Sequence, residues 1–198
     1  MSLLVKICGI TTEEAVTACS DVGVDAVGFV FARSPRRVTP ATAASLAEAL
    51  PEGVLRVAVF RRPEPGEVEM ALREFPADLV QADHEVIPSI AARAVLPVYR
   101  EGSPGTPAHG SLFLYEGASS GVGMEVDRAR AAKLARRGSM ILAGGLDPHN
   151  VFDVIETVQP HGVDVSSGVE SGPGIKDPGR IREFVAAAHS AAERLVRT

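Results

Sequence analysis

Short apolar runs alternate with amphipathic segments along almost the whole chain. The run at 26–32, AVGFVFA, contains no polar side chain, which is typical of a parallel strand buried on both faces. The segment at 11–22 instead repeats apolar residues at the spacing of a helix. Its apolar face consists of Ala15, Ala18, Cys19 and Val22. Cys19 is therefore expected to be a packing residue, and the pattern as a whole predicts alternating strands and helices.

The same pattern can be followed to the end of the chain. Strands are predicted at 4–8, 26–32, 54–60, 78–83, 95–100, 112–116, 140–143 and 162–165. Helices are predicted at 11–22, 40–50, 67–75, 85–93, 126–137 and 181–195, with a further helix start at Asp147 and Pro148. Thr11 and Glu14 form a predicted capping box, and Thr39 is the expected cap before Pro40. The stretch 101–110 is rich in Gly and Pro and is too short for a helix with its turns.

Strands that alternate with helices predict parallel βα units joined by right-handed crossovers. An open doubly wound sheet is the main alternative. Eight strands in one chain favour a closed (β/α)8 barrel, although 198 residues is short for that fold. A reduced or missing fifth helix, at 102–110, accounts for part of the difference. We therefore expect one domain, residues 1–198, with the α/β fold of a small TIM barrel.

Composition narrows the range of partners. A net charge of −5 argues against nucleic-acid binding, and no run approaches the ~20 apolar residues of a membrane span. Two cysteines without a secretory-type start favour a cytoplasmic protein, and the five scattered histidines predict no metal site. The basic cluster Arg33, Arg36 and Arg37 suits a single anionic small molecule. We expect a monomer rather than a dimer.

Candidate chemistry lies where barrel strands end, because barrel active sites lie at the C-terminal ends of the strands. Side chains two residues apart share a face of a strand. Interior-facing sets predicted in this way are Lys6 with Cys8, Gln81 with Asp83, Leu112 and Leu114 with Glu116, and Asp164 with Ser166. Tyr115 is expected to face away. Several strands thus end in polar groups on what can be one common face.

Two glycine turns follow the last two strands, at 143–145 (AGG) and 166–168 (SSG). Glycine lets backbone amides approach an anion, and these two loops are the usual phosphate site of the barrel fold. We expect Gly144, Gly145, Ser167 and Gly168 to bind a phosphate, with a short helix beginning in 171–177.

Taken together, five stretches resemble the phosphoribosylanthranilate isomerase family. They are VKICGIT (5–11), DAVGFVFARSPRRVTP (25–40), LRVAVF (55–60), ILAGGLDPHNV (141–151) and GVDVSSGVESGPGIKD (162–177). The resemblance covers nearly the whole chain. It implies a small (β/α)8 barrel that uses no cofactor. It also implies an Amadori rearrangement of N-(5-phosphoribosyl)anthranilate to a 1-deoxyribulose phosphate, a step of tryptophan biosynthesis.

The resemblance also implies roles for individual residues. Cys8 matches the family's general base, and Arg36 matches the arginine that binds the anthranilate carboxylate. The backbone of the two glycine turns matches the phosphate site. Asp164, at the end of the eighth strand, also matches the family pattern, and we expect it to contact substrate.

The chain departs from the family at two of these positions. Counting back from GVG (121–123) places Glu116 where the family has an aspartate as general acid. In VQADHE (80–85), Gln81 is retained as a substrate contact, but Asp83 takes the family's histidine position and His84 is displaced by one. We expect Glu116 to act as the acid and Asp83 to line the substrate site.

Simpler interpretations stay open for these residues. Cys8 can be a packed core thiol, although Lys6 would favour its thiolate. Asp83 can be the N-cap of a helix that begins at His84. Two other functions also stay open: a related isomerase acting on a different amino-sugar phosphate, and a ligand-binding relative that has lost catalysis.

Overall fold

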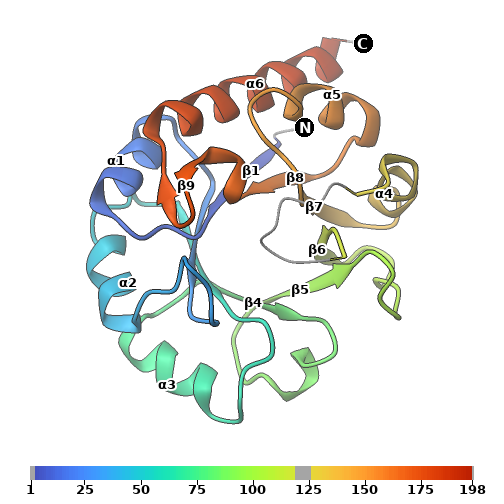
Figure 1. Ribbon diagram of the computed structural model, residues 1–198. Helices are drawn as coiled ribbons and strands as arrows, with labels where there is room; N and C mark the ends of the chain where they lie inside the picture. Colours follow the sequence, from blue (N-terminus) through green and yellow to red (C-terminus); the bar gives the residue numbers. More distant parts are fainter. Residues whose placement is uncertain (1–2, 119–125, 198) are drawn as a thin grey trace.

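The computed structural model describes residues 3–118 and 126–197, and its eight parallel strands close into a barrel in chain order, β1 to β8 (Figure 1). The strands are β1 Leu4–Cys8, β2 Ala26–Val30, β3 Leu55–Val59, β4 Leu79–Asp83, β5 Val95–Arg100, β6 Leu112–Glu116, β7 Ser139–Ala143 and β8 Gly162–Val165. The α-helices are α1 Glu13–Asp21, α2 Pro40–Ala47, α3 Glu67–Glu74, α4 Arg128–Ala135, α5 Val151–Val158 and α6 Pro178–Arg197. The predicted (β/α)8 barrel is confirmed.

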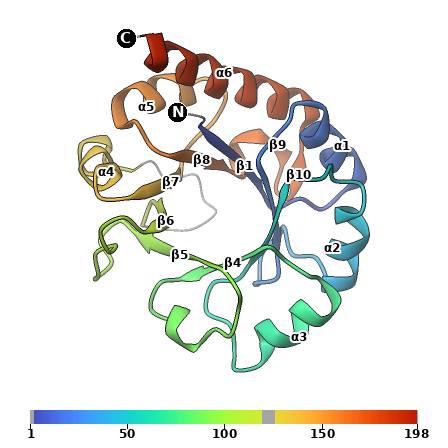
Figure 2. The same cartoon turned by 180° about the vertical axis from the view of Figure 1, so that it is seen from behind.

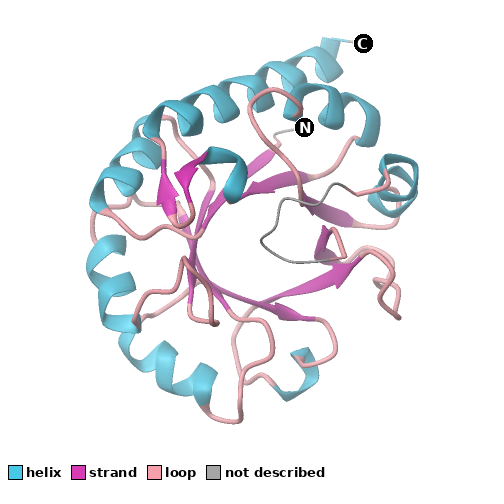
Figure 3. Cartoon of the chain, viewed as in Figure 1, coloured by secondary structure: helices cyan, strands magenta, loops and turns pink. Residues whose placement is uncertain are grey.

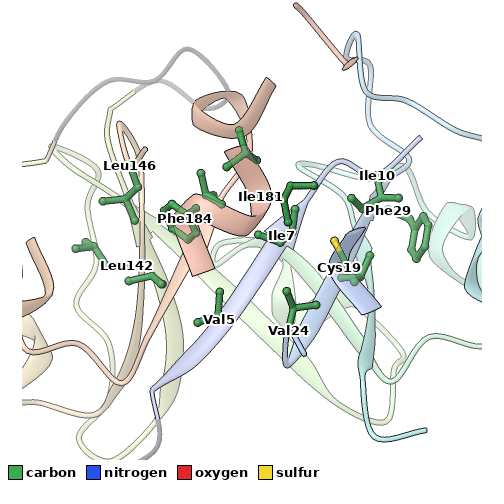
Figure 4. Close-up of a cluster of buried hydrophobic side chains, with 14 of the residues drawn as sticks. Val5, Ile7, Ile10, Cys19, Val24, Phe29, Leu142, Leu146, Ile181 and Phe184 are labelled. Atoms are coloured by element: carbon green, nitrogen blue, oxygen red, sulfur yellow. The ribbon is translucent and has the colours of Figure 1, made fainter. Parts of the chain in front are cut away.

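Two layers of apolar side chains hold the barrel together. Alternate strand residues point inward and form two clusters, one around Val57 and Cys8 and one around Leu96 and Leu114. The other strand residues point outward and pack against the helices in one large core. Figure 4 shows Cys19 in that outer core, close to Ile10, Val24 and Phe29. Cys19 is thus the packing residue that its helical spacing predicts.

No α-helix of the described residues covers the arc of the barrel from β4 to β6, where Figure 3 shows only one short helical turn. The connection after β5 contains no helix, which confirms the expected loss at 102–110. The helix expected at 85–93 is also absent, so that prediction is wrong. Only the 3₁₀ turn η1, Ile87–Ser89, forms there. Pro88 lies in the middle of the expected helix, where it lacks the N–H donor and would clash with the preceding turn.

Two helix starts differ from those expected. Thr12, not Thr11, caps α1, since its hydroxyl accepts the Ala15 N–H, while Thr11 donates to the Gly174 carbonyl oxygen. Asp147 does not begin α5 directly. Its carboxylate accepts the N–H groups of His149 and Asn150 in a turn before the helix, at 2.8 and 3.0 Å. Such side-chain bonds offer the backbone an alternative to the helix.

A small antiparallel hairpin, β9 Glu170–Gly172 with β10 Ile175–Lys176, replaces the short helix expected at 171–177. It follows the 3₁₀ turn η2, Ser167–Val169. Gly174 has a φ of +80°, a conformation that favours glycine and turns the chain. The hairpin lies near β1 and α1 in both views of the molecule (Figures 1 and 2). No helix in the described part of the chain is both long and apolar enough to cross a membrane.

Candidate active site

Lys6, Cys8 and Asp164 form a buried cluster on the inner face of β1 and β8. Lys6 is the register partner of Asp164, and its Nζ donates a hydrogen bond to Asp164 Oδ1 at 2.8 Å. Gly28, the register partner of Cys8, leaves room for both neighbours. A Cβ at this glycine would lie 2.9 Å from Cys8 Sγ and 3.2 Å from Lys6 Nζ. The thiol and the ammonium group therefore share one small space inside the barrel.

Burial and charge set the protonation states of this cluster. Burial lowers the pKa of Lys6, but the charges of Asp164 and Cys8 and the hydrogen bonds to both together outweigh it, and the pKa lies above its ordinary value. Lys6 is therefore a buried cation. Burial raises the pKa of the Cys8 thiol, and the charge of Lys6 offsets this rise only in part. Lys6 thus favours the thiolate as expected, yet the net shift is upward and the resting thiol is protonated at neutral pH.

Arg36 is held in place by Glu170, at the start of the hairpin. Its Nε donates to Glu170 Oε1 at 2.7 Å and its Nη2 donates to Oε2 at 2.9 Å. Lys176 donates to the same carboxylate at 2.7 Å. Burial raises the pKa of Glu170, but the bonds from Arg36 and Lys176 outweigh it, so the net pKa lies below its ordinary value. This two-bonded fork fixes the orientation of the guanidinium group.

Arg36 also explains why a glycine follows the strand that ends at Cys8. Gly9 has a φ of +78°, and a Cβ there would lie 2.6 Å from Arg36 Cδ. Any other residue would be strained and would push the arginine away. The sequence KICG thus places a thiol and a guanidinium group next to each other at one strand end.

A second charged cluster lies across the barrel from the first, because β5 is four strands from β1 in the closed ring of eight. Arg100 Nη2 donates to Glu116 Oε1 at 2.6 Å, and Arg100 Nη1 contacts Asp83 Oδ1. Asp83 also accepts from Arg62 Nε at 3.1 Å and is 2% exposed at its side chain. The carboxylate of Glu116 therefore lies on the inner face, as strand parity predicts, while Tyr115 packs in the outer core.

The structure excludes one of the two interpretations of Asp83, and its place in the substrate site stays a prediction. Its carboxylate binds Arg62 and Arg100, and the 3₁₀ turn that follows has Val86 at its N-cap, so the capping interpretation is wrong. The displaced His84 stacks on Tyr99 of the outer core, with ring centroids 4.2 Å apart. The sequence GVG at 121–123, from which Glu116 was aligned, lies outside the described residues.

Gln81 faces the barrel interior beside this cluster. It is 7% exposed, and its Oε1 has no hydrogen-bond partner among the residues that the structure describes. A buried acceptor without a partner is costly unless a ligand or water supplies a donor. Gln81 is thus suited to accept a hydrogen bond from a bound molecule.

The two glycine turns meet at the C-terminal ends of β7 and β8. Gly144 and Gly145 have φ values of 93° and 67°, where glycine is favoured. Gly168 packs so closely on the other loop that a Cβ there would lie 1.9 Å from the carbonyl oxygen of Leu146. Ser167 begins η2 in the same loop. The four residues thus lie in two touching loops, and their binding of phosphate stays a prediction.

Sequence reasoning missed three charged residues of the site: Arg100, Glu170 and Lys176. Strand parity could have found Arg100, because it follows Leu96 and Val98 on the inner face of β5. No local signal points to Glu170 as the partner of Arg36, which lies 134 positions before it, or to Lys176 as a second donor to Glu170. Among the described residues, no three His, Cys, Asp or Glu side chains lie together as a metal site.

A closed parallel barrel with titratable groups at the C-terminal ends of its strands is the architecture of the (β/α)8-barrel enzymes. A model of the N-(5'phosphoribosyl)anthranilate (PRA) isomerase family matches residues 5–187. The chain is 37% identical over 210 residues to N-(5'-phosphoribosyl)anthranilate isomerase of Paracoccus denitrificans, covering 95% of this chain and 98% of that protein. The chain belongs to this family and is an isomerase.

Solved structures agree with this assignment. TrpF from Jonesia denitrificans matches with a TM-score of 0.84 and 35% identity, over 96% of this chain and 98% of that chain. A phosphoribosyl anthranilate isomerase in complex with reduced 1-(o-carboxyphenylamino)-1-deoxyribulose 5-phosphate matches with a TM-score of 0.81 and 31% identity. That match covers 96% of this chain and 100% of the other.

Proposed function

We propose that this chain converts N-(5-phosphoribosyl)anthranilate to 1-(2-carboxyphenylamino)-1-deoxyribulose 5-phosphate, a step of tryptophan biosynthesis. The observation that carries the proposal is the placement of a thiol and a carboxylate across one barrel mouth, in a chain of this family. Cys8 lies on β1 and Glu116 on β6, both on inner faces. An acid and a base on opposite sides of a bound sugar are what the rearrangement needs.

Ring opening requires an acid. As the bond between C1′ and the ring oxygen breaks, the amine lone pair forms a Schiff base and the ring oxygen takes up a proton. In this proposal Glu116 donates that proton. Arg100 favours the ionised form of Glu116, so the reactive enzyme is the fraction in which this carboxyl is protonated.

The second step requires a base. The Schiff-base cation makes the proton on C2′ acidic, and its removal gives an enolamine that becomes the ketone product. We assign this proton transfer to the thiolate of Cys8. Because burial raises the pKa of the thiol, the thiolate is a minor form at neutral pH, and the nearby cation of Lys6 limits the cost of forming it. A positioned acid or base contributes ~10²–10⁴-fold each.

Substrate binding uses the remaining candidates. We propose that Arg36, fixed by Glu170, binds the anthranilate carboxylate, and that Gln81 accepts a hydrogen bond from a sugar hydroxyl. In this proposal Asp164 and Asp83 line the substrate site at the C-terminal ends of the strands. The carboxylate of Asp164 pairs with Lys6, and that of Asp83 pairs with Arg62 and Arg100. The phosphate would bind to the backbone of Gly144, Gly145, Ser167 and Gly168. A relative of the same fold is in complex with reduced 1-(o-carboxyphenylamino)-1-deoxyribulose 5-phosphate, which supports a phosphorylated ligand of this kind.

We further propose that residues 1–198 act as one domain, as a monomer and in the cytoplasm. The large apolar side chains that are exposed in the described residues are Met70, Ile175 and Val196. They belong to α3, β10 and α6 and do not gather into one patch of the kind that marks an obligate interface. Sedimentation at micromolar concentration would test the monomer.

The function is tested by following the loss of anthranilate fluorescence with purified protein. We expect turnover by the wild type and a loss of ~10²–10⁴-fold in Cys8→Ala. Cys19→Ala is the matched control, because Cys19 is also buried but packs outside the barrel wall. Glu116→Gln should also be inactive, since the amide keeps the shape but carries no acidic proton.

Cys8 is not the base if Cys8→Ala keeps more than about a tenth of the wild-type turnover. An active Glu116→Gln variant removes Glu116 from the role of acid. A wild type that binds the reduced product analogue but never turns over substrate would instead be a ligand-binding relative.

A further inference from the structure

Arg100 binds two carboxylates that belong to neighbouring strands. Its Nη2 lies 2.6 Å from Glu116 Oε1 on β6, and its Nη1 contacts Asp83 on β4. All three side chains are nearly buried, with exposed fractions of 11% for Arg100, 13% for Glu116 and 2% for Asp83. Buried charges of this kind lose most of their hydration and depend on one another.

The strand register fixes this arrangement. Arg100 and Glu116 are register partners, and Asp83 pairs with Val98, two residues earlier on the same face of β5. Asp83 is therefore a diagonal neighbour of Arg100. One planar guanidinium group, with its terminal nitrogens spread as a fork, reaches the two carboxylates with separate nitrogens, whereas a lysine offers a single nitrogen on a flexible stem.

We propose that Arg100 is a positioning residue for Glu116, and that Asp83 anchors Arg100 and shares its charge. The inference rests on the proposed role of Glu116 as the acid. Glu116 has three side-chain torsions, so an unheld carboxyl would sample many positions. Contact with an anchored arginine selects one of them. Asp83 takes up part of the positive charge, so that Glu116 is not locked in its ionised form.

Asp83 and Arg100 thus act on Glu116 in opposite directions. The cation favours the carboxylate over the acid, and the second anion weakens that preference. The mouth holds further charges that face this cluster. They are Arg61 and Arg62 after β3, Glu85 after β4, and Lys6 and Asp164 across the barrel, with the Cys8 thiol beside them. His84 stacks on Tyr99 of the outer core and Glu101 accepts from the Asp127 N–H, so both side chains point away from the cluster. The β7 neighbour of Glu116, Ser139–Ala143, contributes none.

The test is the pH dependence of kcat/KM in variants that remove one member at a time. One limb of the profile follows the protonation of Glu116. In Arg100→Met the carboxyl loses its cation, and that limb should move to higher pH by about 1–3 units. In Asp83→Asn the whole charge of Arg100 acts on Glu116, and the limb should move to lower pH. The lost positioning should also lower kcat of Arg100→Met by ~10²-fold.

Arg56→Met is the matched control. Arg56, near the start of β3, pairs with Asp78, which directly precedes β4. This pair lies at the opposite end of the barrel strands, so Arg56→Met should leave both limbs in place. If Arg100→Met fails to fold, Arg100→Lys keeps the charge but lacks the planar fork that holds each carboxylate with its own nitrogen. It should then lower kcat while the limb moves less than in a neutral variant.

Two outcomes overturn the inference: limbs of Arg100 and Asp83 variants that stay at the wild-type position, or limbs that move in the same direction. If Glu116→Gln is inactive, either result contradicts only the positioning role of Arg100 and leaves the role of Glu116 as the acid in place. An active Glu116→Gln variant contradicts the proposed acid itself, so the two failures are distinguishable.

Discussion

Replacing Lys6 with methionine removes the cation of a buried ion pair and leaves Asp164 without its partner. Lys6 is 1% exposed and Asp164 7% exposed, and 2.8 Å separates Lys6 Nζ from Asp164 Oδ1. Removing one member of a buried pair typically costs about 3–5 kcal/mol, because the other charge stays buried. A whole domain is stable by only about 5–15 kcal/mol, so Lys6→Met should lose a large share of its stability.

Urea denaturation measures this loss. With a slope of about 3 kcal/mol per molar urea, 3–5 kcal/mol lowers the midpoint by roughly 1–2 M. The double variant Lys6→Met/Asp164→Asn removes both charges and should be more stable than Lys6→Met alone, since no unpaired charge is left.

Acidification gives a second readout with a definite sign. Burial raises the pKa of Asp164 and Lys6 counteracts that rise, so without Lys6 the folded-state pKa lies further above the unfolded value. As the pH falls, Asp164 of Lys6→Met is then protonated in the folded state at a higher pH than in the unfolded state. The loss of unfolding free energy in Lys6→Met should therefore shrink as the pH falls through the folded-state pKa of Asp164. A midpoint within about 0.3 M of the wild type, or a double variant as unstable as the sum of the two single ones, would contradict the reasoning.

Two further substitutions test the binding side of the mouth. Gly168→Ala places a Cβ 1.9 Å from the Leu146 carbonyl oxygen, so the two loops must separate. Binding of inorganic phosphate, measured by calorimetry, should weaken, and unchanged phosphate affinity would remove these loops from the phosphate site. Arg36→Ala should raise KM about 10–100-fold, since a hydrogen bond to a charged group contributes about 1.5–3 kcal/mol. Arg36→Lys should raise KM less than Arg36→Ala does. A KM that stays at the wild-type value in both variants would show that Arg36 does not bind the substrate.

The barrel could be predicted because its signals are local. Continuous apolar runs mark buried parallel strands, and the period of two assigns inner and outer faces without any tertiary information. Cys8 and Glu116 were placed on the inner face in this way, and both lie there. The helix expected at 85–93 failed because one proline outweighs the propensity of its neighbours.

The charges around the candidate residues could not be predicted in the same way. Arg36 depends on Glu170, which the hairpin brings across 134 positions of sequence. The protonation of Cys8 depends on how deeply the thiol is buried, and a sequence motif does not show burial. The sequence predicts Lys6 as a charge that favours the thiolate, but its pairing with Asp164 depends on β1 and β8 lying side by side in the closed barrel.

The central claim is that Cys8 removes the proton from C2′ of the substrate. Single-turnover reactions with substrate carrying deuterium at C2′ test it directly. The account predicts that wild-type protein reacts more slowly with the deuterated substrate and that deuterium leaves C2′ during the reaction. It also predicts that Cys8→Ala binds the substrate but does not release deuterium from C2′ at a measurable rate. Release of deuterium by Cys8→Ala at the wild-type rate would contradict the account.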